Sequence, residues 1–173
     1  MKILLLSSYH SGSHQAWADG YAESSGHEVQ LLTLPGRLWK WRMAGGAVPL
    51  AEQFLASDFT PDLVLATDMV DLATFLALTR RRLAGVPAVL YMHENQLTYP
   101  LPKENGKGPM RRNWGVRERQ YVLINWKAQL TADAILFNSH HHQESWFGTL
   151  PVFLKHYQEF NGLDSILFRQ RIG

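Results

Sequence analysis

The chain has 173 residues, a length typical of one domain that can bury its own core. Hydrophobic residues make up 46% and charged residues 18%, and the net charge is only +2, a composition typical of a soluble globular protein. The chain has no cysteine and no apolar run near the roughly 18 residues of a membrane span, so disulfides and thiolate sites are excluded and we expect a cytoplasmic protein with no membrane partner.

Short apolar runs alternate with amphipathic stretches along the whole chain. The runs predict five strands, at 2–8, 27–33, 63–67, 86–92 and 133–137, and the stretches predict helices at 13–25, 72–84 and 116–131. Gly26 and Gly85 are expected to end the first two helices, and Asp71 is expected to cap the second. Ser139 is expected to cap a further helix after the last strand.

This alternation predicts a single α/β domain over residues 1–173, with a Rossmann-like, doubly wound parallel sheet. The near-continuous apolar strands indicate a sheet that is covered on both faces. We expect strand order 3-2-1-4-5, in which the first and fourth strands are neighbours where the winding reverses. Ligands of such sheets bind beyond the carboxyl ends of the strands, so loops 9–15 and 93–100 are predicted to form a cleft.

The first loop contains Gly12, Ser13 and His14, which we predict to bind phosphate groups. Gly12 permits a positive φ angle, Ser13 can cap the following helix, and helix N-terminal amides attract a sugar-nucleotide diphosphate or an RNA phosphate. The loop is neither a GxGxxG nor a Walker motif, which argues against nicotinamide and P-loop sites. A purely structural turn is the alternative.

The second loop concentrates polar side chains after a buried strand. Sugar hydroxyls require paired donors and acceptors together with aromatic surfaces, and histidine supplies both hydrogen-bonding roles near neutral pH. We therefore predict His93 as the catalytic residue, and the following residues as the sugar or acceptor pocket: Glu94, Asn95, Gln96 and Tyr99. The alternative is a polar loop that only covers the strand end.

Other polar features are given smaller roles. A zincin motif would need a second histidine at position 97, where the chain has Leu97. The side chains of His140, His141 and His142 would point about 100° apart on a helix, so they do not converge on one ion and we expect no metal site. Asp68 follows the third strand but is a weak candidate on its own.

The segment after the second strand alternates basic and aromatic residues. Such side chains stack on bases and pair with phosphates, which predicts RNA binding. The alternative, in which the tryptophans plug the edge of the core, is equally open. The predicted RNA-binding residues are Arg37, Trp39, Lys40, Trp41 and Arg42.

Four motifs, taken together and in order, resemble a known family. They are Gly12-Ser13-His14, Trp39-Lys40-Trp41-Arg42, the HENQLxYP pattern of His93 to Pro100, and Phe137-Asn138-Ser139. Over essentially the whole chain the sequence is similar to the N-terminal domain of the tRNA-queuosine α-mannosyltransferase family. The HENQLxYP segment is the specific part of this resemblance.

The resemblance implies the acceptor-side half of a GT-B glycosyltransferase that transfers mannose from GDP-mannose to queuosine in tRNA, with retention and without a metal. It implies that His93 contacts the transferred sugar and that Gly12 and Ser13 face the donor phosphates. The nucleotide-sugar-binding C-terminal domain would be absent from this chain, which alone should be inactive. The alternative function is a non-catalytic RNA- or nucleotide-binding module with steeply salt-dependent binding.

Overall fold

The computed structural model describes residues 1–98 and 116–161, apart from the side chains of 116–118, 156 and 158–160. Tyr99, one of the predicted pocket residues, lies outside these ranges. The elements are β1 (Lys2–His10), α1 (Gly12–Ser24), β2 (Glu28–Pro35), α2 (Trp39–Gly45), α3 (Ala47–Leu55), β3 (Leu63–Thr67), α4 (Leu72–Thr79), β4 (Ala88–Met92), α5 (Val116–Thr131), β5 (Ala134–Phe137) and α6 (His140–Asn161).

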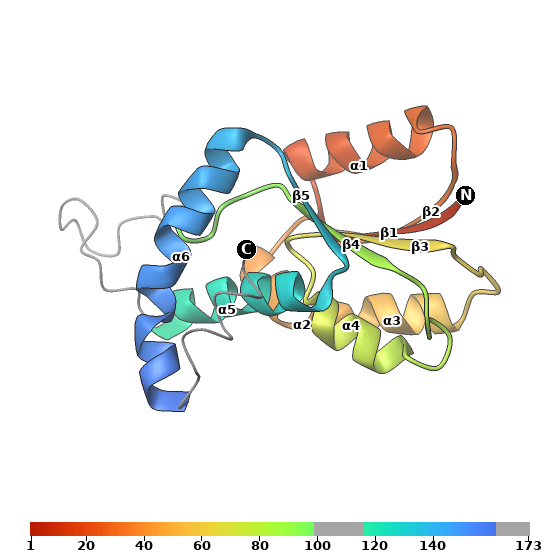
Figure 1. The fold of residues 1–173 in the computed structure, drawn as a ribbon. Helices are drawn as coiled ribbons and strands as arrows, with labels where there is room; N and C mark the ends of the chain where they lie inside the picture. The colour runs from red at the N-terminus through yellow and green to blue at the C-terminus, as the bar shows by residue number, and fades with distance from the viewer. Residues whose placement is uncertain (99–115, 162–173) are drawn as a thin grey trace.

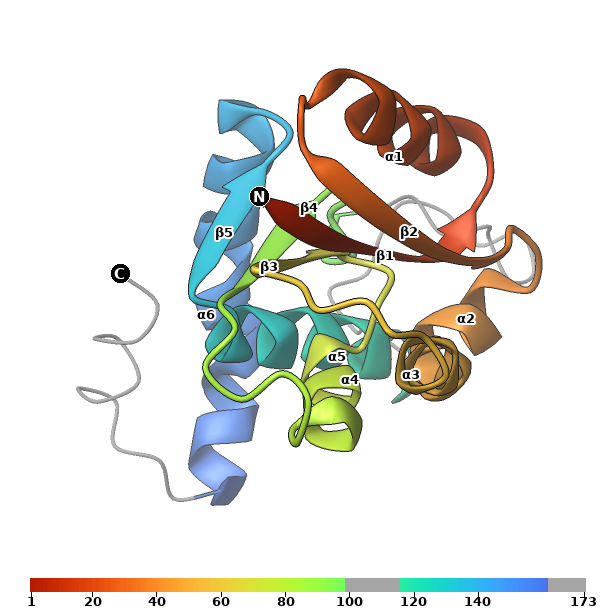
Figure 2. The same cartoon turned by 90° about the vertical axis from the view of Figure 1, so that its right-hand side faces the viewer.

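The five strands form one parallel sheet in the order β2-β1-β3-β4-β5, which confirms the predicted doubly wound fold (Figure 2). The order matches the predicted 3-2-1-4-5 only loosely, and the expectation that β1 and β4 are neighbours is wrong. Leu5 of β1 pairs with Leu65 of β3, which in turn pairs with Val89 of β4. The connection through α2 and α3 returns the chain past β1, so β3 lies between β1 and β4 and the winding reverses between β1 and β3.

Helices cover both faces of this sheet (Figure 1). One face carries α1, whereas α2, α3, α4 and α5 lie on the other, and α6 packs at the β5 end. Alternate residues of β1 supply both layers: Leu4 and Leu6 enter the larger core cluster, and Ile3 and Leu5 enter a smaller one beneath α1. All four are fully buried, as expected for a parallel sheet that is covered on both faces.

Several local expectations are confirmed. Gly26 adopts a φ angle of +68° just after α1 ends. The Asp71 carboxylate accepts the Thr74 N–H at 3.2 Å and so caps α4, and the Ser139 hydroxyl accepts the His142 N–H at 3.2 Å. In the described part of the chain, no helix has the length and hydropathy to cross a membrane.

Candidate functional site

The turns after β1, β3 and β4 meet at the carboxyl ends of three adjacent strands, around the reversal between β1 and β3. Two contacts bridge the first and last of these turns, even though β3 separates their strands. The His93 Nε2 atom lies 3.1 Å from the Ser13 hydroxyl, and the His14 Nε2 atom lies 3.3 Å from a Glu94 carboxylate oxygen. The predicted meeting of the two loops is therefore observed.

The segment after β4, residues 93–98, is held by side chains from three other elements. Its backbone groups and the Asn95 side-chain amide form hydrogen bonds with α6, with the residue after β5 and with the turn after β3. These bonds fix the conformation of the segment. The hydrogen bonds are Glu94 N–H to Asp68 Oδ2 (3.1 Å), Asn138 Nδ2 to His93 O (2.8 Å) and Asn95 Nδ2 to Ser145 Oγ (3.2 Å). Asn95 thus anchors the loop to α6.

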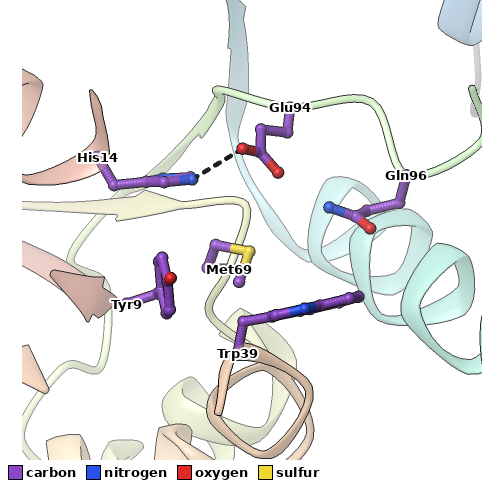
Figure 3. Close-up of a pocket in the computed structure, with 6 residues that line it drawn as sticks. All are labelled: Tyr9, His14, Trp39, Met69, Glu94 and Gln96. Atoms are coloured by element: carbon purple, nitrogen blue, oxygen red, sulfur yellow. Dashed lines mark hydrogen bonds and ion pairs between the residues drawn. The ribbon is translucent and has the colours of Figure 1, made fainter. Parts of the chain in front are cut away.

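An open cavity of about 80 Å³ lies beside these contacts (Figure 3). Its aromatic side is formed by Tyr9 at the end of β1 and Trp39 at the start of α2. The centroid of the Trp39 ring lies 5.0 Å from that of the Tyr121 ring. Flat aromatic faces beside hydrogen-bonding edges suit a sugar ring or a nucleobase. The complete lining is Tyr9, His14, Trp39, Met69, Glu94 and Gln96.

His14 and Glu94 form a charged pair at this cavity. Burial alone would lower the pKa of His14, but the hydrogen bond to Glu94 and the negative charges of Asp68 and Glu94 outweigh it and raise that pKa. The hydrogen bond from His14 in turn lowers the pKa of Glu94, and burial opposes this only in part. A hydrogen bond with the Gln96 side chain, which also lines the cavity, lowers the pKa of Glu94 further.

His93 lies against His14 with opposite protonation behaviour. The two ring centroids are 4.3 Å apart, at an interplanar angle of 37°. Burial and the positive charge of His14 lower the pKa of His93, so its ring is neutral at neutral pH. A neutral imidazole carries one N–H donor and one acceptor nitrogen, and two neighbouring groups with opposed pKa shifts are a common feature of sites that handle protons.

Asp68 accepts the Glu94 N–H and is fully buried. Burial raises the pKa of its carboxyl group to about 7, although the positive charge of His14 and the backbone N–H of Glu94 oppose the shift. The residue was a weak candidate from sequence because a single aspartate after a strand has many structural uses. With the correct strand order, Asp68 would have been placed at the winding reversal, where ligands of such sheets bind, and would have been a stronger candidate.

The predicted phosphate turn is only partly as expected. Ser13 does not cap α1, because the helix begins one residue earlier, with Ser11 as N-cap, and the Ser13 hydroxyl faces His93 instead. Gly12 has a φ angle of +55° and open space where a side chain would stand. The first N–H groups of a helix have no intrahelical acceptor, so this opening exposes donors suited to an anion. His14 is buried in the cavity wall.

The basic and aromatic segment is divided between two roles. Trp39 and Trp41 both belong to α2, but Trp39 packs against Tyr121 and lines the cavity, whereas Trp41 is 77% exposed. The Lys40 ammonium lies 5.6 Å from the Trp39 ring centroid, and Arg42 Nε donates to the Pro35 carbonyl at 3.2 Å. The core-edge interpretation therefore fits Trp39, and the exposed-platform interpretation fits Trp41.

Comparison with known proteins identifies sequences to which this chain is similar. A family model described as tRNA-queuosine alpha-mannosyltransferase N-terminal matches residues 2–168. A tRNA-queuosine alpha-mannosyltransferase of Drosophila melanogaster is 29% identical over 159 residues, which are 91% of this chain and 39% of that protein. The chain thus spans about two fifths of the length of this relative. No solved structure matches the chain.

Proposed function

Because the chain belongs to the tRNA-queuosine α-mannosyltransferase N-terminal family, we propose that it is the acceptor-side half of a GT-B glycosyltransferase acting on tRNA. The proposed reaction transfers mannose from GDP-mannose to queuosine with retention, and a C-terminal domain would hold most of the nucleotide sugar. The observation that carries this proposal is the cavity at the strand ends, where aromatic faces lie beside the paired His14 and Glu94.

In this proposal, catalysis depends on positioning and electrostatics and uses no metal ion or further cofactor. The neutral His93 ring would form a hydrogen bond with a hydroxyl of the transferred sugar. The free amides at Gly12 and Ser13 would stabilise the departing diphosphate. The queuosine base would lie against the Trp39 ring. Glu94 would accept hydrogen bonds from it, and the Gln96 amide would donate hydrogen bonds to it and accept them from it.

The test is a transfer assay of the protein encoded by the complete reading frame. Queuosine-containing tRNA is incubated with GDP-mannose or with another nucleotide sugar, and the digested nucleosides are separated and weighed by mass spectrometry. We expect one hexose on queuosine with GDP-mannose only, and none on tRNA that lacks queuosine. Salt-dependent tRNA binding without any product would instead support the non-catalytic binding module.

The exposed Trp41 side chain should contribute to RNA binding without contributing to stability. Stacking of a base on an aromatic ring is worth about 1–3 kcal/mol, so Trp41→Ala should raise the Kd for tRNA at least about fivefold. The free energy of unfolding should change by less than about 0.5 kcal/mol, because the ring is 77% exposed. Filter binding at fixed salt and urea unfolding measure the two effects.

Leu78→Ala is the matched control for this experiment. Leu78 is also an exposed apolar side chain on a helix, but it lies near the far end of α4. Its replacement should leave the Kd for tRNA unchanged. If Trp41→Ala binds tRNA as the wild type does, the side chain has no part in RNA recognition.

A further inference from the structure

Asp68 is held in one orientation by backbone contacts on two sides. Its N–H donates to the Tyr91 carbonyl at 3.0 Å, and its own carbonyl accepts the Asn125 amide of α5 at 2.6 Å. These bonds tie the start of the turn after β3 to β4 and to α5. The Asp68 side chain therefore extends from a backbone that is fixed by β4 and α5 and not by the residues that line the cavity.

The carboxylate of Asp68 serves the residues of the site. Its Oδ2 atom accepts the Glu94 N–H at 3.1 Å, whereas Oδ1 is buried and has no hydrogen-bond partner among the described residues. A buried carboxylate with an unbonded oxygen is costly for the fold, and such groups persist where they have a functional role.

The charged and titratable groups around Asp68 come from three elements. His14 approaches from α1, Glu94 and His93 from the segment after β4, and Tyr91 from β4 itself. The positive charge of His14 stabilises the ionised form of Asp68, and the negative charge of Asp68 helps to hold the proton on His14. The protonation of Asp68 and that of His14 are therefore linked through their charges.

We infer that Asp68 is a positioning residue for the transfer reaction: it fixes Glu94 through the backbone N–H and keeps His14 protonated against the Glu94 carboxylate. The role of Asp68 in transfer rests on the proposed function. Its contacts with Glu94 and its charge interaction with His14 do not depend on that function. With Asp68 ionised, the three groups carry a net charge of −1, and with Asp68 protonated they carry none. Asp68 does not line the cavity, so its ionisation acts on the cavity through His14 and Glu94.

The direct test is a histidine titration followed by NMR in the wild-type protein and in Asp68→Asn. The His14 resonances are assigned with His14→Gln. Removing the carboxylate should lower the pKa of His14 by about one unit, which is a tenfold loss of proton affinity. An unchanged His14 titration in a folded Asp68→Asn protein would overturn the inference.

Asp71→Asn is the matched control, because Asp71 lies in the same turn and its carboxylate caps α4 through Thr74. This variant should lose stability and leave the His14 titration unchanged; an equal shift in both variants would mean that the effect is only structural. If Asp68→Asn does not fold, the wild-type protein still decides the question. The pKa of its His14 should lie above the ordinary histidine value, as the contacts with Glu94 and Asp68 require, and a His14 pKa at or below that value would overturn the inference.

Activity provides the second readout. In the wild-type protein, a plot of kcat against pH should show an inflection near pH 7, where Asp68 ionises. Asp68→Asn should lower kcat and remove this inflection, with little change in KM for tRNA. A profile that keeps this inflection would contradict the role in transfer. If the wild-type protein transfers no sugar at all, the proposed function fails, whereas the titration still tests the coupling between Asp68 and His14.

Discussion

Replacing His93 by alanine in the complete protein should lower kcat for sugar transfer by about 100-fold or more, because the side chain would contact the reacting sugar. The Kd for tRNA should change by less than about threefold, since the RNA would be held largely by the exposed residues of α2. Single-turnover transfer and filter binding, measured on the same preparation, separate these two effects.

The pH dependence of this reaction follows from the neutral state of His93. Burial and the charge of His14 lower the pKa of His93, so the ring stays neutral until the pH falls below its ordinary titration range. Protonation then removes the acceptor nitrogen, and kcat should fall on the acid side. The His93→Ala protein should lack this acid limb, because no imidazole remains to be protonated.

His27→Ala is the control for His93→Ala. His27 is an exposed histidine between α1 and β2, at the opposite end of the strands, so its loss should leave kcat unchanged. A His93→Ala enzyme with normal kcat would refute the catalytic role. A fall in kcat accompanied by an equal weakening of tRNA binding would indicate a role in acceptor binding instead.

The strands could be predicted from sequence because burial on both faces leaves a continuous apolar run, as in Leu4 to Leu6. Their order could not. An apolar run states that both faces are covered, but it does not identify the neighbouring strand. Here the order depends on the path through α2 and α3. The alternating basic and aromatic residues around Trp39 are interpreted from sequence as an RNA-binding loop, and no element is predicted for Ala47–Leu55.

The sequence was sufficient to predict which turns come together at the site, since the carboxyl ends of parallel strands lie along one edge of the sheet. The partners of individual side chains were not. Ser13 could be expected to cap its own helix, and yet its hydroxyl faces His93; Asn95 could be expected in the pocket, and yet it anchors to α6. Such choices follow from tertiary packing, because local and distant partners compete for the same donor or acceptor.

The same limit explains why Asp68 was undervalued. Its neighbour Asp71 had a clear local role as a helix cap, and this role is confirmed. The contacts of Asp68 are with Glu94 and Asn125, which lie far away in sequence and are adjacent only in the folded chain. Local patterns therefore identified the structural aspartate and not the one that contacts the site.

Arg82→Ala should destabilise the domain strongly, because this half-buried side chain bonds to several backbone carbonyls. Arg82 lies in the turn after α4, and its guanidinium reaches the C-terminus of α3, where the last carbonyls have no intrahelical donor. It also packs 4.3 Å from the Phe54 ring centroid. The carbonyl acceptors are those of Phe54 (2.8 Å), Leu55 (3.4 Å), Ser57 (2.7 Å) and Phe59 (2.8 Å).

The expected loss for Arg82→Ala is about 2–4 kcal/mol in the free energy of unfolding, because hydrogen bonds to a charged donor are strong and the partly buried carbonyls of Ser57 and Phe59 would lose their Arg82 donor together. The Phe54 carbonyl would keep the Ser57 N–H and hydroxyl as donors. Urea unfolding measures it. Arg82→Lys keeps the charge but offers no planar fork, so it should recover only part of the loss. Arg80→Ala should cost less than about 0.5 kcal/mol, because Arg80 is exposed and, among the described residues, its side chain bonds only to the Ala77 carbonyl of its own helix. Equal costs for Arg80→Ala and Arg82→Ala would show that the stability of the domain depends on surface charge, and not on the hydrogen bonds from Arg82 to the end of α3 and to the segment that follows it.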